Sequence, residues 1–509
     1  MKTINIKYCL VALVLLFSTS CEKGLDKLNE SETGFTTLDP ILQLNGAVIN
    51  TSFQTGTLIY EIAIVQQVVS PNGGVLAGAN FNQDNRSLLA PTWSTYYRNV
   101  IRNTRDVIRN LEGNTLRANL RNMARIFQAY TFMVLTDSYG EIPYTEAGNG
   151  YSDDILFPKY NTQQEIYTDI IKELTEAAAA LDPAGTIETG DVLYAGNIAQ
   201  WKKFGYSLLL RAGMRLSKID ATKAAATVQA AFAAGPIMAN ADNAYVRHTS
   251  DYQQPIGNTL NGTEAANFYL AKPFVDSLKS RNDPRLSAIA IRYKGATSGP
   301  TQTVGIGTTA PADQIGMPMG KDNGTIGAQA TADGLASFYD YSQVDRRRLV
   351  KGASPVFFVT AAQTQLLLAE ARERGWIATG VTKDYYDAGV TLHMQQMATY
   401  DANSTVAPAA ITTYLSNNPF DPANAFNQIN TQYWIASFLN GPEAFANFRR
   451  SGFPALAPNP YPGKDITGQF IRRLTYPNSE ISVNTTNVNE AITRQGADNL
   501  DTRVWWDKP

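Results

Sequence analysis

A single stretch, residues 124–147, constrains the fold of this chain more than any other part of the sequence. Large apolar residues recur at its start with spacings of four, three and four, at Met123, Phe127, Tyr130 and Val134. This spacing places an apolar stripe along an α-helix, and apolar groups on its other sides predict a helix buried among other helices. No proline or glycine interrupts the pattern before Gly140, which can adopt the left-handed conformation that ends a helix, and Pro143 then prevents a restart.

Further helices are predicted from the same kind of spacing, most of them in adjacent pairs. Thr162, followed by Glu165 three residues later, has the pattern of a capping box at the start of one of them. Residues 201–208 approximate the opening pattern of a tetratricopeptide repeat, although the pairs do not recur at one fixed period. The sequence therefore predicts an all-α fold of degenerate tetratricopeptide-type helical hairpins with long irregular loop insertions. The predicted helices are 40–67, 93–111, 117–139, 161–181, 197–219, 221–234, 360–375, 382–400 and 430–439.

The predicted helices leave one large insertion, at about residues 238–355. It is rich in Gly, Asn, Thr and Ala, and helical spacing is sparse within it. A loop of this length must either be functional or have been wrongly divided into elements. We therefore expect a single domain over residues 40–509, with a helical scaffold at about 93–235 and 360–450 and a ligand face formed by the insertion.

The first 39 residues have the features of an export signal followed by a tether. Lys2 and Lys7 give a positive start, and residues 8–17 form an apolar run too short to span a bilayer. Small residues then precede Cys21, as in a bacterial lipoprotein signal, so we predict a signal peptide over 1–20, lipidation of Cys21 and a tether over 21–39. Ser18 stands where such signals usually have leucine, which leaves open an ordinary secretory signal with an incidental cysteine.

The cysteine content favours lipidation. The chain has two cysteines, one of them within the predicted leader, so the mature protein has a single cysteine and no intramolecular disulfide. The formal net charge is −2, from 43 basic and 45 acidic residues, which argues against a nucleic-acid-binding surface.

The residues that carry most enzyme chemistry are sparse. The two histidines, His248 and His393, cannot form a zinc site, and the spacing around His393 is that of a buried helix residue. Motifs of serine hydrolases, zinc proteases and phosphate-binding loops are absent from the sequence. Asp137 and Glu141 flank the helix exit, where we expect them to hydrogen-bond the turn. A glycoside hydrolase, which needs only two facing carboxylates, stays open as an alternative. We expect no cofactor and no metal.

Aromatic residues in the loops give the better ligand hypothesis. A flat ring matches the apolar face of a sugar, while amide, carboxylate and guanidinium groups match its hydroxyls. The densest cluster is residues 338–341, and packing of this cluster onto the scaffold is the competing interpretation. The candidate ligand-binding residues are Phe338, Tyr339, Tyr341, Tyr252 and Phe81.

Several ordered motifs resemble those of the SusD/RagB family of outer-membrane nutrient-binding lipoproteins, in particular its SusD-like branch. They extend over most of the chain and define the scaffold rather than a ligand pocket. The matching segments are residues 129–144, 365–371, 374–376, 440–445, 448–454, 473–477 and 505–507, together with the lipoprotein-like start.

The resemblance implies a lipid-anchored protein on the outer leaflet of the outer membrane, facing the cell exterior. It implies a partner, a SusC-like TonB-dependent transporter, to which the protein delivers oligosaccharides, and it implies no catalysis. Some family members handle peptides, so the same architecture binding peptides stays open as a second alternative. A deep enclosed channel would favour peptides, and exposed aromatic rings with polar rims would favour glycans.

Overall fold

The computed structural model describes residues 38–150 and 152–509. Contacts divide the chain into two units, Met1–Asp39 and Pro40–Pro509. Lipidation of Cys21, the signal peptide and most of the tether were predicted for residues that lie outside the described part. Within the described residues, no helix is both long enough and apolar enough to cross a membrane.

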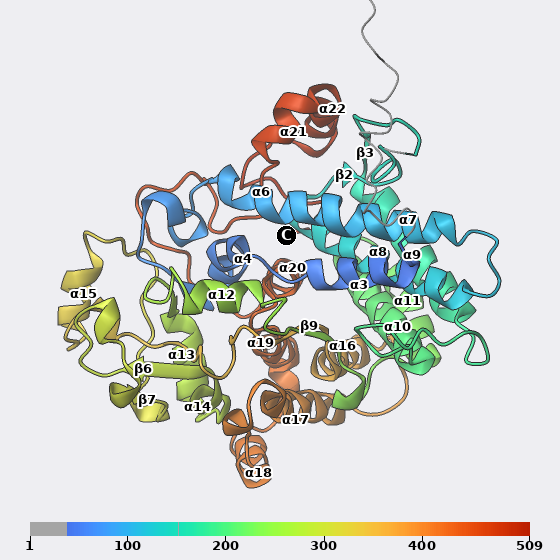
Figure 1. Cartoon of the computed structure of the whole chain (residues 1–509). Coiled ribbons are helices and arrows are strands. Elements are labelled where there is room, and N and C mark those ends of the chain that lie inside the picture. Colours follow the sequence, from blue (N-terminus) through green and yellow to red (C-terminus); the bar gives the residue numbers. More distant parts are fainter. Residues whose placement is uncertain (1–37, 151) are drawn as a thin grey trace, which may run out of the picture. The chain divides into compact units, whose positions relative to one another are not determined.

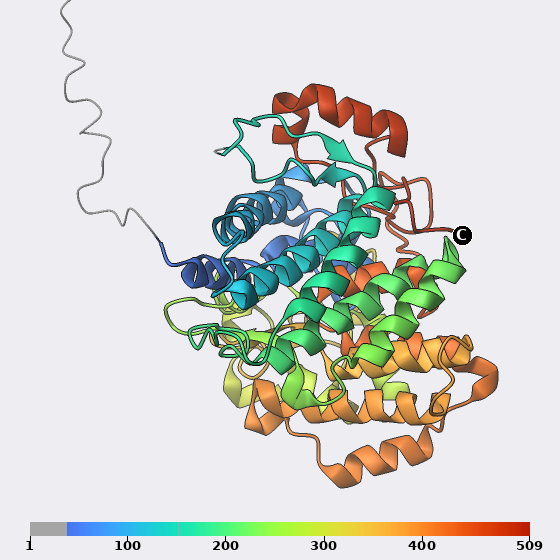
Figure 2. The same ribbon diagram turned by 90° about the vertical axis from the view of Figure 1, so that its right-hand side faces the viewer.

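The second unit is mostly helical, which confirms the predicted all-α fold. Its first half begins with short helices and continues with long antiparallel ones that stack side by side (Figures 1 and 2). The helix that the sequence placed at the centre is α8, and nearly all of its residues are buried. These elements are α3 Pro40–Asn50, α4 Thr55–Ile59, α5 Glu61–Ile64, α6 Arg86–Thr95, the π-helix η3 Tyr96–Ile101, α7 Arg102–Asn110, α8 Ala118–Tyr139, α9 Gln163–Ala180, α10 Ile198–Arg215 and α11 Ala221–Ala234.

Local sequence signals set the ends of these helices. Thr162 caps α9, and its side chain and that of Glu165 form the predicted capping box. Gly140 ends α8 with a φ of +81° and a ψ of −118°, which is a positive-φ conformation other than the left-handed helical one. The positive φ favours glycine here, and a Cβ atom at this position would also displace the side-chain amide of Gln495, whose Oε1 would lie 1.8 Å away.

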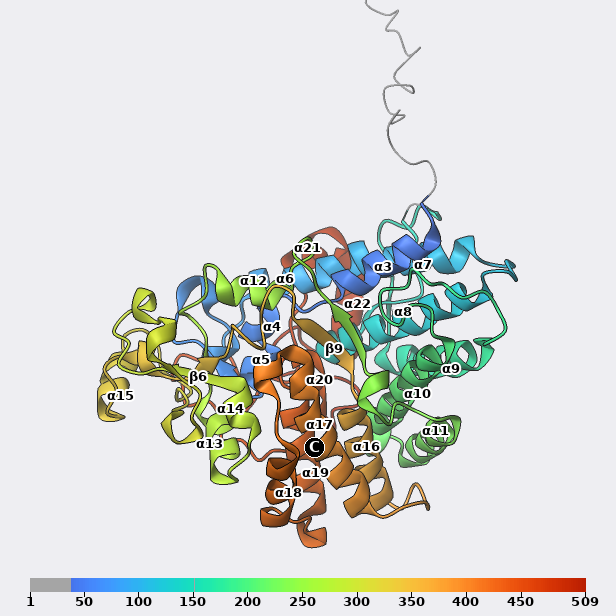
Figure 3. The same cartoon turned by 60° about the horizontal axis from the view of Figure 1, so that its bottom comes forward.

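The scaffold continues after the insertion and completes the stack. In Figure 3, α16, α17 and α19 lie together below α10, and in Figure 1, α21 and α22 lie above α6 at the top of the view. The two helices predicted at 360–375 and 382–400 form one hairpin and correspond to α16 and α17. These elements are α16 Ala361–Glu373, α17 Thr382–Tyr400, α18 Pro408–Asn417, α19 Ala425–Ala436, α20 Gly441–Ser451, α21 Asn478–Val483 and α22 Thr485–Gln495.

The insertion contains more regular structure than its sequence predicted. Short helices and antiparallel strand pairs, β1–β5, β4–β9 and β7–β6–β8, hold it together, and its outer part lies at the left of Figure 1. The helices were missed because each spans too few residues to show a helical period. The elements of the insertion are β4 Ala244–Arg247, α12 Pro255–Asn261, β5 Tyr269–Leu270, α13 Lys272–Ser280, α14 Arg285–Ile289, β6 Ala290–Tyr293, β7 Gly307–Thr308, α15 Ile326–Ala332 and β8 Gln343–Val344. Their partner strands outside it are β1 Val68–Val69, which comes long before the insertion, and β9 Pro355–Val359, which begins at its end.

Buried ion pairs connect the scaffold helices. Arg215 of α10 contacts Asp137 of α8 at 3.1 Å and Glu443 of α20 at 2.6 Å. Glu370 of α16 contacts Arg450 of α20 at 2.6 Å. The prediction that Asp137 hydrogen-bonds the turn was wrong, because its carboxylate instead accepts hydrogen bonds from Tyr167, Arg215 and Trp506, which lie far away in sequence.

Candidate functional site

The predicted aromatic cluster of the insertion divides into exposed and buried rings. Phe338 and Tyr339 are half-buried and stack on each other, with ring centroids 4.1 Å apart. Tyr341 is 0% exposed, and its hydroxyl donates to Asp333 at 2.5 Å. The ring of Tyr341 therefore offers no face to a ligand, because it packs in a small apolar cluster with Tyr269.

The two other predicted ligand residues lie apart from this cluster in sequence. Phe81 is 2% exposed and packs against Tyr461 at 4.7 Å between ring centroids. Tyr252 is 63% exposed, and its carbonyl oxygen lies 2.7 Å from Nδ1 of His248. Of the five predicted residues, Tyr252, Phe338 and Tyr339 are thus accessible to solvent.

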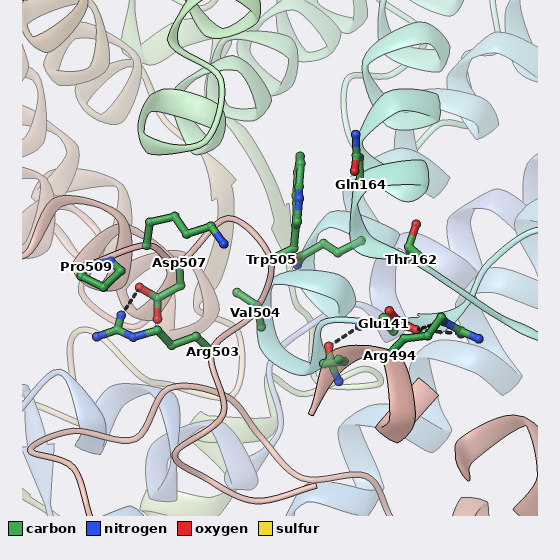
Figure 4. Close-up of a pocket in the computed structure, with 12 residues that line it drawn as sticks. Glu141, Thr162, Gln164, Arg494, Arg503, Val504, Trp505, Asp507 and Pro509 are labelled. Atoms are coloured by element: carbon green, nitrogen blue, oxygen red, sulfur yellow. Dashed lines mark hydrogen bonds and ion pairs between the residues drawn. The ribbon is translucent and has the colours of Figure 1, made fainter. Parts of the chain in front are cut away.

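A cavity lies between the start of α9, the end of α22 and the last residues of the chain. It has a volume of about 480 Å³, and we call it the Trp505 pocket (Figure 4). Its lining residues are Glu141, Thr162, Gln163, Gln164, Arg494, Gln495, Arg503, Val504, Trp505, Asp507, Lys508 and Pro509.

The neighbouring tryptophan, Trp506, fixes Trp505 in this pocket. Trp506 is fully buried, and its indole N–H donates to Oδ1 of Asp137 at 2.9 Å. Arg449 lies over its ring at 4.9 Å. Trp505 and Trp506 form the middle of a turn, closed by a hydrogen bond from the amide of Asp507 to the carbonyl oxygen of Val504 at 3.0 Å, and Trp505 lines the pocket while Trp506 points into the core. Trp505 remains half-buried, with its ring centroid 6.5 Å from that of Tyr167.

Both carboxylates in the pocket wall are held by arginines. Arg494 contacts Glu141 at 2.7 Å, and Arg503 contacts Asp507 at 2.7 Å. Figure 4 shows these two ion pairs on either side of Trp505. Burial raises the pKa of Glu141, and the bond and charge of Arg494 oppose this rise. Each carboxylate of the pocket wall therefore has an arginine as its counter-charge.

The remaining groups suit an uncharged polar ligand that has an apolar face. Trp505 supplies a flat ring, and Gln164 and Thr162 supply amide and hydroxyl groups beside it (Figure 4). Residues 505–507 were recognised only as a family-like motif, and this site was missed. The available signal was the pair of adjacent tryptophans outside any predicted helix.

Both histidines are buried, and each contacts a polar side chain of the fold. His393 is buried, with Nδ1 3.0 Å from Nη1 of Arg285, and burial together with this arginine lowers its pKa well below the ordinary value. His248 bonds Ser52 at 2.7 Å, and burial lowers its pKa. Across residues 38–150 and 152–509, no three His, Cys, Asp or Glu side chains are grouped as a metal site requires.

Comparison with protein families gives a match over most of the chain. The model of a SusD-like family described as "Starch-binding associating with outer membrane" matches residues 35–477. Comparison with curated proteins gave no match.

Solved structures resemble the chain over nearly its whole length. A chitin-binding protein has a TM-score of 0.81 at 28% identity, covering 92% of this chain and 100% of its own. A SusD-like protein from Bacteroidetes has a TM-score of 0.81 at 25% identity, covering 93% and 100%. A chitin-binding SusD homologue from Flavobacterium johnsoniae has a TM-score of 0.75 at 22% identity, covering 92% and 98%, and this likeness shows the fold alone.

Proposed function

The chain belongs to the SusD-like family, and on this premise we propose that it captures oligosaccharides at the cell surface without cleaving them. The observation that carries the proposal is the Trp505 pocket, where an accessible indole ring lies beside amide and hydroxyl groups. A similar structure, 28% identical, is named a chitin-binding protein, which supports a saccharide as the ligand class. Because both wall carboxylates are paired with arginines, the pocket suits binding rather than hydrolysis.

The proposal includes the destination of the ligand. We infer that Cys21 carries lipid that anchors the protein to the outer membrane, facing outwards, and that a SusC-like TonB-dependent transporter receives the ligand. An open pocket fits this role, since a ligand that is to be passed on must also be released. The family description, which places its members at the outer membrane, supports this location.

The test is titration calorimetry of the purified protein with chitohexaose and maltohexaose, comparing wild type with Trp505→Ala. Loss of the ring should weaken binding at least about tenfold, because an aromatic contact contributes on the order of 1 kcal/mol beyond the burial of its area. Trp376→Ala is the matched control, because Trp376 is also half-buried but lies outside the pocket.

A third variant, Tyr339→Ala, separates the pocket from the insertion. If this variant alone loses binding, the saccharide site lies on the stacked pair of Phe338 and Tyr339. Tighter binding of a hexapeptide than of either sugar, or the appearance of new reducing ends during incubation, would contradict the proposal.

A further inference from the structure

A second cavity lies beside α6 and α7 and combines aromatic rings with arginines. We call it the arginine pocket; it has a volume of about 400 Å³. The aromatic ring that its floor exposes is that of half-buried Tyr97, whose centroid lies 4.9 Å from that of buried Trp93, and Tyr160 stacks behind Trp93 at 6.4 Å. The hydroxyl of Tyr97 donates to the carbonyl oxygen of Pro143 at 2.8 Å, which fixes the ring in the wall.

The rim of the arginine pocket carries Arg98 and Arg102, both exposed to solvent. Within the described part of the chain, neither guanidinium forms a hydrogen bond or an ion pair. The next two arginines along the same helix are engaged, because Arg105 donates to the carbonyl oxygen of Tyr144 at 2.8 Å and Arg109 pairs with Asp153 at 2.9 Å. The unpaired arginines are therefore those that line the cavity.

The backbone around the pocket is unusual in two places. The segment from Tyr96 to Ile101 is a π-helix, a form that is rare and often occurs at functional sites. Opposite it, Gly148 has a φ of +80°, and a Cβ atom there would lie 3.0 Å from Cγ of Arg105. Glycine at this position lets the loop approach α7 closely and close the wall of the pocket.

One carboxylate, that of Glu480, also lines the cavity, and neutral donors hold it. Tyr160 donates to it at 3.0 Å, and Trp93 and Asn484 bond it as well. Glu480 pairs with neither Arg98 nor Arg102 among the described residues. Asp106 lies one turn beyond Arg102, where its charge interacts with Arg102 and Arg109. The rim thus keeps two guanidinium groups directed at solvent above an aromatic floor.

We propose that the arginine pocket binds an acidic sugar residue, with the ring on the aromatic floor and a carboxylate between Arg98 and Arg102. Guanidinium groups bind carboxylates through charge-assisted hydrogen bonds, and an aromatic surface selects an anion that carries a ring over a bare one. This inference rests on the proposed saccharide function and adds a second subsite with a different substrate class.

The test uses trigalacturonate as the probe and its methyl ester as the matched uncharged control, in titration calorimetry at low salt. Trigalacturonate should bind at least about tenfold more tightly than the ester. Its binding should weaken with added salt, since exposed charges are screened. The double variant Arg98→Gln/Arg102→Gln should remove this preference, whereas Arg109→Gln, on the same helix but outside the cavity, should keep it.

The outcomes separate this inference from the proposed function. Equal binding of trigalacturonate and its ester, or a preference unchanged in the double variant, would overturn it. Inorganic sulfate binding as tightly as trigalacturonate would also overturn it, because the aromatic floor would then contribute nothing. Binding of chitohexaose or maltohexaose that depends on Trp505 should persist in the double variant. Loss of that binding would instead mean that the two pockets act as one site.

Discussion

Single residues at the centre of the scaffold show how charge is accommodated in the protein interior. Glu370 is surrounded by Arg450 at 2.6 Å and Arg374 at 2.8 Å. Burial alone would raise the pKa of Glu370, but the two arginines reverse this and hold it at about 2. Glu61 is buried without such a pair, and burial raises its pKa to about 7, while Arg449 and Ser138 offset only part of the rise. The two glutamates are therefore expected to change the free energy of unfolding with pH in opposite directions.

Replacing Glu370 with Gln should lower the free energy of unfolding at pH 7 by about 3 kcal/mol, because Arg450 loses its buried counter-charge. Since the folded pKa lies below the unfolded value, this contribution is present above pH 4.5 and is lost as the pH falls towards 2. Urea unfolding at several pH values should show the gap between wild type and variant closing over this range. Glu112→Gln, at an exposed site, should stay within about 0.5 kcal/mol throughout. A gap that does not change with pH would refute the argument.

Replacing Glu61 with Gln should change the free energy of unfolding in the opposite direction. The folded pKa lies above the unfolded one, so the stabilising contribution of the protonated form is present below pH 4.5 and is lost as the pH rises through 7. The variant should therefore gain stability on the order of 2 kcal/mol over wild type at pH 8 and little at pH 4. The same urea series measures this difference. A loss of stability at pH 8 would mean that Arg449 depends on the ionised carboxylate.

At the scale of elements, glycines set how closely the scaffold helices approach. A Cβ atom at Gly205 of α10 would lie 2.8 Å from Cβ of Ala178 on α9 and 3.3 Å from Cδ1 of Ile126 on α8. A Cβ atom at Gly389 of α17 would lie 2.6 Å from Cγ of Leu366 on α16. Close contact between neighbouring helices, rather than a turn, therefore requires glycine at these two helical positions.

Gly205→Ala should lower the free energy of unfolding by about 1–3 kcal/mol, because overpacking outweighs the better helix propensity of alanine. The control is Gly46→Ala in α3, where no atom lies within 4 Å of the added Cβ. That change should stabilise the protein by about 0.5–1 kcal/mol. Thermal unfolding of both variants measures the difference. Equal effects at the two sites would show that propensity alone matters.

At the scale of the whole molecule, the proposed function requires both a membrane anchor and a folded ligand-binding unit. The proposed attachment is through a lipid at Cys21. A single acyl chain gives only marginal membrane binding, and stable anchoring takes more than one chain.

Cys21→Ser should move the protein from the membrane fraction to the soluble fraction after export, because the lipidated thiol would be absent. Fractionation of cells followed by immunoblotting measures this. Cys9→Ser is the control, since Cys9 lies within the predicted leader and should leave the distribution unchanged. Persistent membrane association of the Cys21 variant would contradict lipid anchoring.

The sequence by itself determined the helical scaffold. Residues 123–140 predicted α8, and Thr162 with Glu165 predicted the capping box of α9, because helix periods and caps depend on neighbours within a few residues. The motifs also predicted the family, which the match over residues 35–477 confirms.

Only the tertiary structure decided which aromatic rings face solvent. Tyr341 and Phe81 share their local composition with accessible residues, yet both are buried, since burial depends on segments far away in sequence. The Trp505 pocket depends in the same way on Asp137, which anchors Trp506 from a position 369 residues earlier. Contacts of that range leave no periodic trace in a sequence, because the two partners meet only when the helices between them have packed.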